Sequence, residues 1–158
     1  MSLSSLYSNL HYYNERAGYW QRSVNTYSAQ ITDLSNKISD REQQLALARG
    51  ARNSCDDMHN VNNDVKESFE SLGMSATAAL EIDSCKAAAQ KIVDGNDGDI
   101  DNAVSACDSL IQKLQDEISD LKHLYNTAMQ NKDYAQRRAA TFQGYARSTR
   151  QEIKNYRD

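Results

Sequence analysis

Three cysteines and three histidines are the side chains in this sequence that could most readily bind a metal or attack a substrate. They are Cys55, Cys85, Cys107, His11, His59 and His123. No two cysteines have the spacing of metal ligands, and no histidine lies in a His-Glu-x-x-His motif or beside a Cys-x-x-Cys pair. An odd, sparse set of cysteines favours free thiols in a reducing compartment. We expect no metal and no cofactor, while a disulfide between Cys55 and Cys85 remains open.

The carboxylates also lack the pattern of a calcium or catalytic site. The segment 94–99 begins like an EF-hand loop, but Gly98 stands where the fifth oxygen ligand belongs and Ser105 where the bidentate glutamate belongs. Asp56 and Asp57 are adjacent, so their side chains diverge on a helix and do not form an acid–base pair. The chain has no glycine-rich phosphate loop and no nucleophile elbow. We therefore expect a protein that is not an enzyme.

The composition favours a few long helices. The 158-residue chain has no proline and six glycines, whereas sandwiches and barrels need these residues in many turns. Eighteen basic residues are distributed among twenty-two acidic ones, and the net charge of -4 disfavours binding to nucleic acid or to an anionic membrane. No apolar run is long enough to span a bilayer, and no Sec-type signal is visible. We expect a cytoplasmic protein, or one exported by a non-Sec route.

Two stretches carry apolar residues at heptad spacing, the pattern of helices that pack along one another. We call their heptad positions the seam. In the first third the seam consists of Leu3, Leu6, Leu10, Tyr13, Ala17, Trp20, Val24, Tyr27, Ile31, Leu34, Ile38, Arg41, Leu45 and Ala48. In the last third it consists of Val104, Cys107, Ile111, Leu114, Ile118, Leu121, Tyr125, Ala128, Lys132, Ala135, Ala139, Phe142, Ala146, Thr149, Ile153 and Tyr156.

The two seam stretches fit together when the helices are antiparallel. If paired residue numbers sum to about 159, Ala17 faces Phe142 and Trp20 faces Ala139, so large side chains meet small ones. The residues between the stretches are less regular. Met58, Val61, Val65, Phe69 and Leu72 keep a helical period, but in a shifted phase. We expect the first helix to continue through them.

Glycines and small polar residues divide the chain into its expected elements. In order, these are a long helix over 3–70, a turn over 71–77 that includes Leu72 and Gly73, a short helix over 78–93, a loop over 94–99 and a long helix over 100–157. The predicted fold is a single all-α domain, a long antiparallel two-helix coiled-coil hairpin with an interrupted return helix. A four-helix bundle is the alternative.

Aromatic residues gather near the two ends of the chain, which a hairpin brings together. Tyr13, Trp20 and Phe142 lie on the seam and are expected in the core. The tyrosines off the seam are Tyr12, Tyr19, Tyr134 and Tyr145. Exposed tyrosine is favoured in protein interfaces, so these four residues are a candidate partner interface. The alternative is that they only cover the edge of the seam.

The helical hairpin, the lack of proline and the small residues at the expected turn resemble the WXG100 superfamily of type VII secretion. The likeness extends to the YwqH-like helical proteins that accompany LXG-domain toxins in Gram-positive bacteria. The segment 69–76, Phe-Glu-Ser-Leu-Gly-Met-Ser-Ala, occupies the place of the Trp-x-Gly turn of that superfamily. Leu72 stands directly before Gly73, no tryptophan is present there, and the aromatic-then-acid tail signal is missing because Thr149 follows Tyr145 at the fourth position.

The resemblance implies a non-catalytic adaptor or chaperone. Such a protein would lay one face along the helical domain of an LXG toxin, mask apolar surface and support targeting or export by helix-to-helix packing. The expected partner is thus a protein with an apolar helical surface, without nucleic-acid binding or membrane insertion. The alternative is a structural coiled-coil scaffold of a phage or cell envelope that forms a homodimer or larger homo-oligomer.

Overall fold

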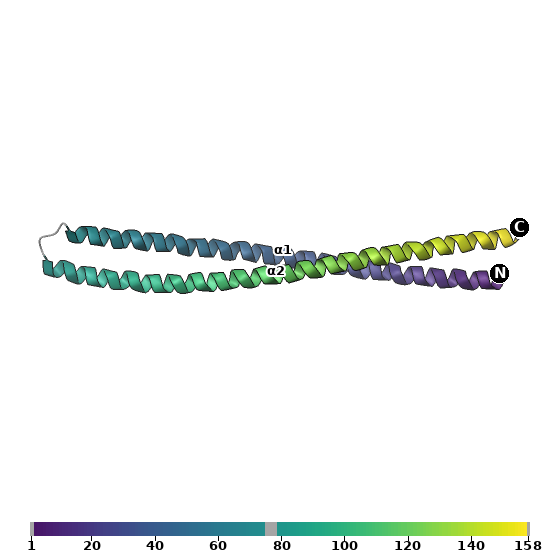
Figure 1. The fold of residues 1–158 in the computed structure, drawn as a ribbon, viewed down its shortest axis with the longest axis horizontal. Helices are drawn as coiled ribbons and strands as arrows, with labels where there is room; N and C mark the ends of the chain where they lie inside the picture. Colours follow the sequence, from purple (N-terminus) through teal and green to yellow (C-terminus); the bar gives the residue numbers. More distant parts are fainter. Residues whose placement is uncertain (1, 75–78, 158) are drawn as a thin grey trace. The chain divides into compact units, whose positions relative to one another are not determined.

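In the computed structural model the protein is an all-α helical hairpin of two helices, α1 (Leu3–Met74) and α2 (Ala79–Arg157) (Figure 1). The structure describes residues 2–74 and 79–157, with the side chains of 2–67, 91 and 93–156. The chain groups into two compact units. Unit 1 is Met1–Ser39 with Ser119–Asp158, and unit 2 is Asp40–Ile118. The hairpin is the predicted fold, and the described residues form no four-helix bundle.

The predicted seam is the core of unit 1. Its buried members are Leu6, Ala17, Val24, Ala128, Ala135, Ala139, Phe142, Ala146, Thr149 and Ile153. Tyr156 departs from the prediction, because it is 59% exposed. The Tyr13 and Tyr145 rings lie 5.3 Å apart, which agrees with the antiparallel register expected from the sequence. Small residues opposite large ones let the helices approach closely here.

In unit 2, polar contacts hold the two helices in register. Arg41, the charged residue of the first seam stretch, pairs with Glu117 at 2.7 Å. Arg52 donates to Asp108 at 2.8 Å. Both pairs are partly exposed to solvent, so each contributes about 0–1 kcal/mol, and we expect their main effect to be that they favour one alignment of the helices.

The expected loop over 94–99 is wrong, and the return helix is not interrupted: α2 continues through this segment. Gly95 and Gly98 adopt no left-handed conformation. Each glycine costs about 1 kcal/mol of helix propensity relative to alanine, an amount that tertiary contacts can offset. Those contacts come from α1, because Asn62 and His59 both reach Asp97 in the middle of the segment.

The first helix is longer than predicted. α1 includes Leu72 and Gly73 and ends at Met74, beyond the expected end near residue 70. Glycine is tolerated inside a helix, and no proline forces an earlier end. The remainder of the expected turn, 75–77, lies outside the described residues. Within the described part of the chain, neither helix has a stretch long and apolar enough to cross a membrane.

Candidate functional site

Unit 1 contains a group of aromatic rings centred on Phe142. This side chain is only 7% exposed and contacts rings from both helices. Tyr12 meets it edge-on with ring centroids 6.2 Å apart, Tyr145 meets it edge-on at the same distance, and Tyr13 lies 6.4 Å away. Such edge-on pairs stabilise a structure by about 0.5–1.5 kcal/mol beyond the area they bury. The rings of Tyr12 and Tyr145 are therefore supported by contacts with Phe142, although they are exposed to solvent.

A second group of rings surrounds Trp20, which meets Tyr19 and Tyr134 edge-on at 5.2 Å and 5.4 Å. Two arginines join the groups. The guanidinium of Arg138 lies 5.9 Å from the tryptophan ring and 5.3 Å from the phenylalanine ring. Arg16 lies 5.8 Å from Tyr19 and equally far from the phenylalanine. We call the following nine residues the aromatic cluster: Tyr12, Tyr13, Arg16, Tyr19, Trp20, Tyr134, Arg138, Phe142 and Tyr145.

Three N–H groups of the aromatic cluster are buried without a hydrogen-bond acceptor among the described residues. They are Nε of Arg16, Nε of Arg138 and Nε1 of Trp20. A buried donor left unsatisfied costs about 1–3 kcal/mol, which the cation–π contacts of the arginines offset in part. Buried polar groups without hydrogen-bond partners are expected mainly at functional or strained sites of a protein.

The four tyrosines predicted as an interface are the exposed part of the aromatic cluster. Tyr12, Tyr19, Tyr134 and Tyr145 are between 49% and 54% exposed. Each directly precedes a seam residue along the chain. Its side chain therefore lies beside the interface between α1 and α2, and on the same flank of the seam at all four positions. In the same unit, positions of this kind from both helices line one cleft, among them Asp33 and Thr127. The four tyrosines thus lie on one side of unit 1, which we call the tyrosine face.

The two units carry net charges of opposite sign, which the net charge of the whole chain does not show. Unit 1 has eleven basic and six acidic residues, a net formal charge of +5. Unit 2 has seven basic and sixteen acidic residues, a net formal charge of −9. The sequence reading of evenly distributed charge is therefore wrong at the level of the units, because a hairpin gathers the two basic ends of the chain into one unit. The two units thus carry net charges of opposite sign.

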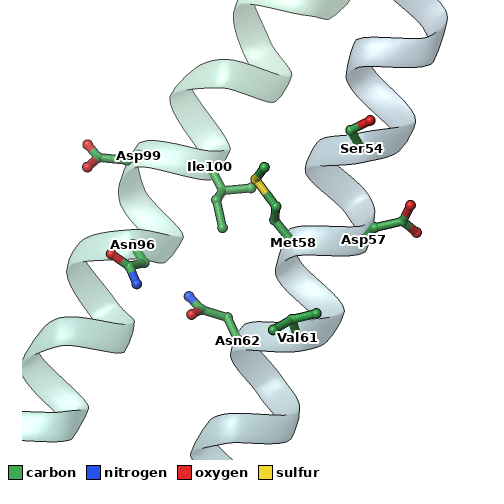
Figure 2. A pocket seen from close by; sticks show the side chains of 8 residues that line it. All are labelled: Ser54, Asp57, Met58, Val61, Asn62, Asn96, Asp99 and Ile100. Carbon is green, nitrogen blue, oxygen red and sulfur yellow. The ribbon is translucent and has the colours of Figure 1, made fainter.

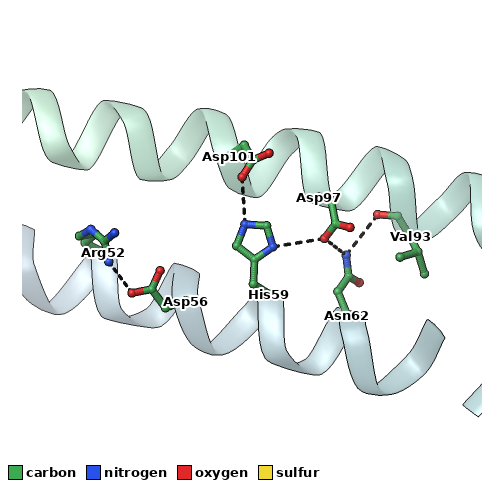
Figure 3. A network of polar contacts seen from close by, with 7 residues as sticks. All are labelled: Arg52, Asp56, His59, Asn62, Val93, Asp97 and Asp101. Carbon is green, nitrogen blue, oxygen red and sulfur yellow. Dashed lines mark hydrogen bonds and ion pairs between the residues drawn. The ribbon is translucent and has the colours of Figure 1, made fainter. Parts of the chain in front are cut away.

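In unit 2 a polar network lies between the two helices (Figure 3), in addition to the buried apolar residues Ala48, Val93, Leu114 and Ile118. Asn62 is buried, and its Nδ2 donates to the Val93 carbonyl oxygen at 3.2 Å and to Asp97 Oδ1 at 2.9 Å. His59 lies between two carboxylates, with Nδ1 3.3 Å from Asp97 and Nε2 3.0 Å from Asp101. Both ring nitrogens can donate at once only in the imidazolium form. In coiled coils, a polar residue between the helices fixes their register at some expense of stability, and we expect Asn62 to act in this way.

The Asn62 hydrogen bond, followed by the interaction with His59, lowers the pKa of the Asp97 carboxyl. A carboxyl with a depressed folded-state pKa stabilises the fold above its unfolded pKa of about 3.9, and this contribution is lost as pH falls through the folded value. We expect Asn62→Ala to raise the pKa of Asp97, measured by NMR titration of its side-chain carbon. The variant should also lose less stability than the native chain when the pH falls below about 4.

Asn60→Ala is the matched control, because Asn60 is exposed on the same helix two residues away. It should leave the Asp97 titration unchanged. An unaltered midpoint in Asn62→Ala would show that this hydrogen bond does not govern the carboxyl.

The cysteines are arranged differently from the pairing left open by the sequence. Cys55 and Cys107 are free and half-buried, and they lie near each other on the two helices. Burial, and then the neighbouring thiol, raise the pKa of Cys55. The side chain of Cys85 lies outside the described residues. The structure thus places Cys55 opposite Cys107, which the sequence reading had assigned only to packing.

Sequence reasoning identified the four exposed tyrosines and the seam rings that they contact, but it missed Arg16, Arg138 and the polar network of unit 2. Arg16 and Arg138 directly precede seam residues, as the tyrosines do, and this shared position is a signal that could have identified them. The shifted phase of Met58, Val61 and Val65 was visible in the sequence. The sequence pattern alone does not show which stripe of α1 faces α2, so the structural consequence of this shift could not be predicted.

Among the described side chains, no group of three or more histidine, cysteine, aspartate or glutamate residues could hold a metal ion. Comparisons with models of protein families, with curated proteins and with solved structures found no match to this chain.

Proposed function

We propose that this chain is a non-catalytic helical adaptor that binds a helical protein partner through the tyrosine face of unit 1. The main observation behind this proposal is that the four tyrosines are exposed to solvent and are also held by contacts with other rings. The four tyrosines are half-exposed, yet their rings pack against the buried Phe142 or the half-buried Tyr13 and Trp20. Tyrosines held in this way lose little conformational entropy on binding, and they offer both an apolar ring and a hydroxyl group.

The positive net charge of unit 1 favours a partner that carries negative charge. Its net charge of +5, with Arg16 and Arg138 within the aromatic cluster, favours a helix that presents apolar residues beside carboxylates. The resemblance to proteins that accompany LXG toxins suggests the helical domain of such a toxin as this partner. The adaptor would then cover apolar surface of the toxin and assist its targeting or export, as a chaperone does.

The proposal is tested by coexpression of the full chain with the helical domain of a candidate toxin, followed by light scattering. A one-to-one complex is expected. The double variant Tyr12→Asp/Tyr19→Asp should weaken binding at least about tenfold, because it introduces charge into the centre of the contact, while circular dichroism shows an unchanged helix content.

The matched control is Gln21→Asp/Asn25→Asp, which adds the same charge at exposed positions of α1 that follow seam residues and so border its other side. It should bind like the native chain. A symmetric homodimer that is indifferent to the toxin would overturn the proposal in favour of a homo-oligomeric scaffold. Unchanged binding by the tyrosine variant would place the contact elsewhere.

A further inference from the structure

Helix α1 carries a second apolar stripe in unit 2, and this stripe does not face α2. It follows a heptad spacing of alternating four and three residues. Five of its six members are apolar and the sixth is a serine; they are Leu47, Ala51, Ser54, Met58, Val61 and Val65, which we call the outer stripe. All six are exposed, and the three with the largest exposure are Leu47 at 75%, Val61 at 62% and Met58 at 58%. A sustained heptad of this kind is the sequence pattern of a helix that packs against another helix.

In this part of α1, the residues that face α2 are largely polar. Each of them directly follows a residue of the outer stripe. They are Ala48, Arg52, Cys55, His59, Asn62 and Lys66. All six are buried or half-buried. Their contacts with α2 run through ion pairs and hydrogen bonds, such as those of Arg52 and Asn62. The hairpin therefore satisfies the polar stripe of α1 internally and leaves the apolar stripe uncovered.

Helix α2 continues the same surface, so the outer stripe forms one wall of a groove. A cleft of roughly 570 Å³ lies between Met58 and Val61 on α1 and Asn96, Asp99 and Ile100 on α2 (Figure 2). The Met58 side chain reaches toward Ile100 across this cleft. Further along α2, three exposed positions that directly precede seam residues are apolar. They are Ala103, Ala106 and Leu110. The groove thus has apolar side chains on both helices.

The charges around the groove define its occupant. Asp57 and Asp99 line the cleft on α1 and α2, and their side chains point outward from it (Figure 2). No ion pair among the described residues neutralises either carboxylate. Unit 2 as a whole has a net charge of −9. A second copy docked by this surface would bring two such units together, whereas a helix with basic flanks would complement the charge.

We propose that this groove binds the apolar face of a basic amphipathic helix from a protein partner, making unit 2 two-thirds of a three-helix bundle. Apolar side chains at heptad positions of the partner pack on the outer stripe, and its lysines and arginines lie near Asp57 and Asp99. This inference rests on the proposed function only in taking the ligand to be a helical protein. The groove and the tyrosine face lie in different units and share no residue.

The test uses the full chain and a fluorescent synthetic peptide of about four heptads, with leucine at the two core positions and lysine at the flanking positions. Saturable binding is expected, and it should weaken as salt concentration rises. Met58→Asp/Val61→Asp should weaken binding at least about tenfold. This variant adds negative charge, which would strengthen a purely electrostatic attachment of the basic peptide, so its loss of binding reports the apolar groove.

Asn53→Asp/Asn60→Asp is the matched control, because it adds the same charge at exposed positions of the same turns that lie outside the outer stripe. It should bind the peptide at least as well as the native chain. Tyr12→Asp/Tyr19→Asp should also bind normally, which separates a failure here from a failure of the tyrosine face. Equal binding by Met58→Asp/Val61→Asp would overturn the proposal. So would equal affinity for a glutamate-flanked peptide, or a homodimer broken by the same variant.

Discussion

Mild oxidation is expected to join Cys55 to Cys107 and to stabilise the hairpin strongly. The two thiols lie near each other on α1 and α2, and the neighbouring residues Arg52 and Asp108 form an ion pair between the same helices. A disulfide here closes a loop of about 50 residues, which corresponds to about 4 kcal/mol in the chain-entropy model. Oxidised glutathione would accept the two electrons, and two protons would leave the thiols. The measurements are the loss of two hydrogen atoms by mass spectrometry and a raised urea midpoint.

The reaction should be slow at neutral pH and faster in alkali, because burial raises the pKa of Cys55 and the thiolate is the reacting species. A Cys85→Ser background leaves only the facing pair, and Cys55→Ser in that background is the matched control. The control should show neither the mass change nor the added stability. Peptide mapping that found Cys55 joined to Cys85 in the native chain would contradict the facing arrangement.

Phe142→Ala is expected to be the most destabilising single truncation in unit 1. Phe142 is buried and lies among rings from both helices and two guanidinium groups, so its removal leaves a cavity and unsupported aromatic residues. The expected loss is about 3–5 kcal/mol of unfolding free energy. Trp20 is the only tryptophan of the chain and belongs to the same cluster, so its fluorescence reports the urea unfolding of unit 1.

Leu124→Ala is the control for this truncation, because it removes an apolar side chain that is 52% exposed on the same helix of the same unit. Its effect should be within about 0.5 kcal/mol. Similar urea midpoints for the two variants would mean that the aromatic cluster does not form the core of unit 1. A change in the slope of the transition would instead point to an altered unfolded state.

The parts of the fold that could be predicted are those governed by local periodicity. The heptad seam identified the buried residues of unit 1 and the antiparallel alignment of Tyr13 with Tyr145, because a stripe of one period has only one face to bury. The same reasoning placed the four tyrosines outside the core. Their exposure of about half follows directly from their positions beside the seam.

The segment 94–99 could not be predicted correctly because local and tertiary preferences conflict there. Glycine and aspartate disfavour a helix when considered alone, and the contacts that compensate come from Asn62 and His59, more than thirty residues away. The paired thiols of Cys55 and Cys107 are likewise a consequence of register. Sequence spacing alone gives no reason to prefer this pair over one that includes Cys85.

The class of fold, the seam of unit 1 and the tyrosines that border it follow from the amino-acid sequence alone, because they depend on the period of the helix. Both stripes of α1 in unit 2, the polar one and the apolar one, are also present in the sequence. Which of them faces α2 is established only in the folded hairpin, since it depends on the ion pairs and hydrogen bonds available from the other helix. Those contacts turn the outer stripe to solvent, and with it they create the acidic groove.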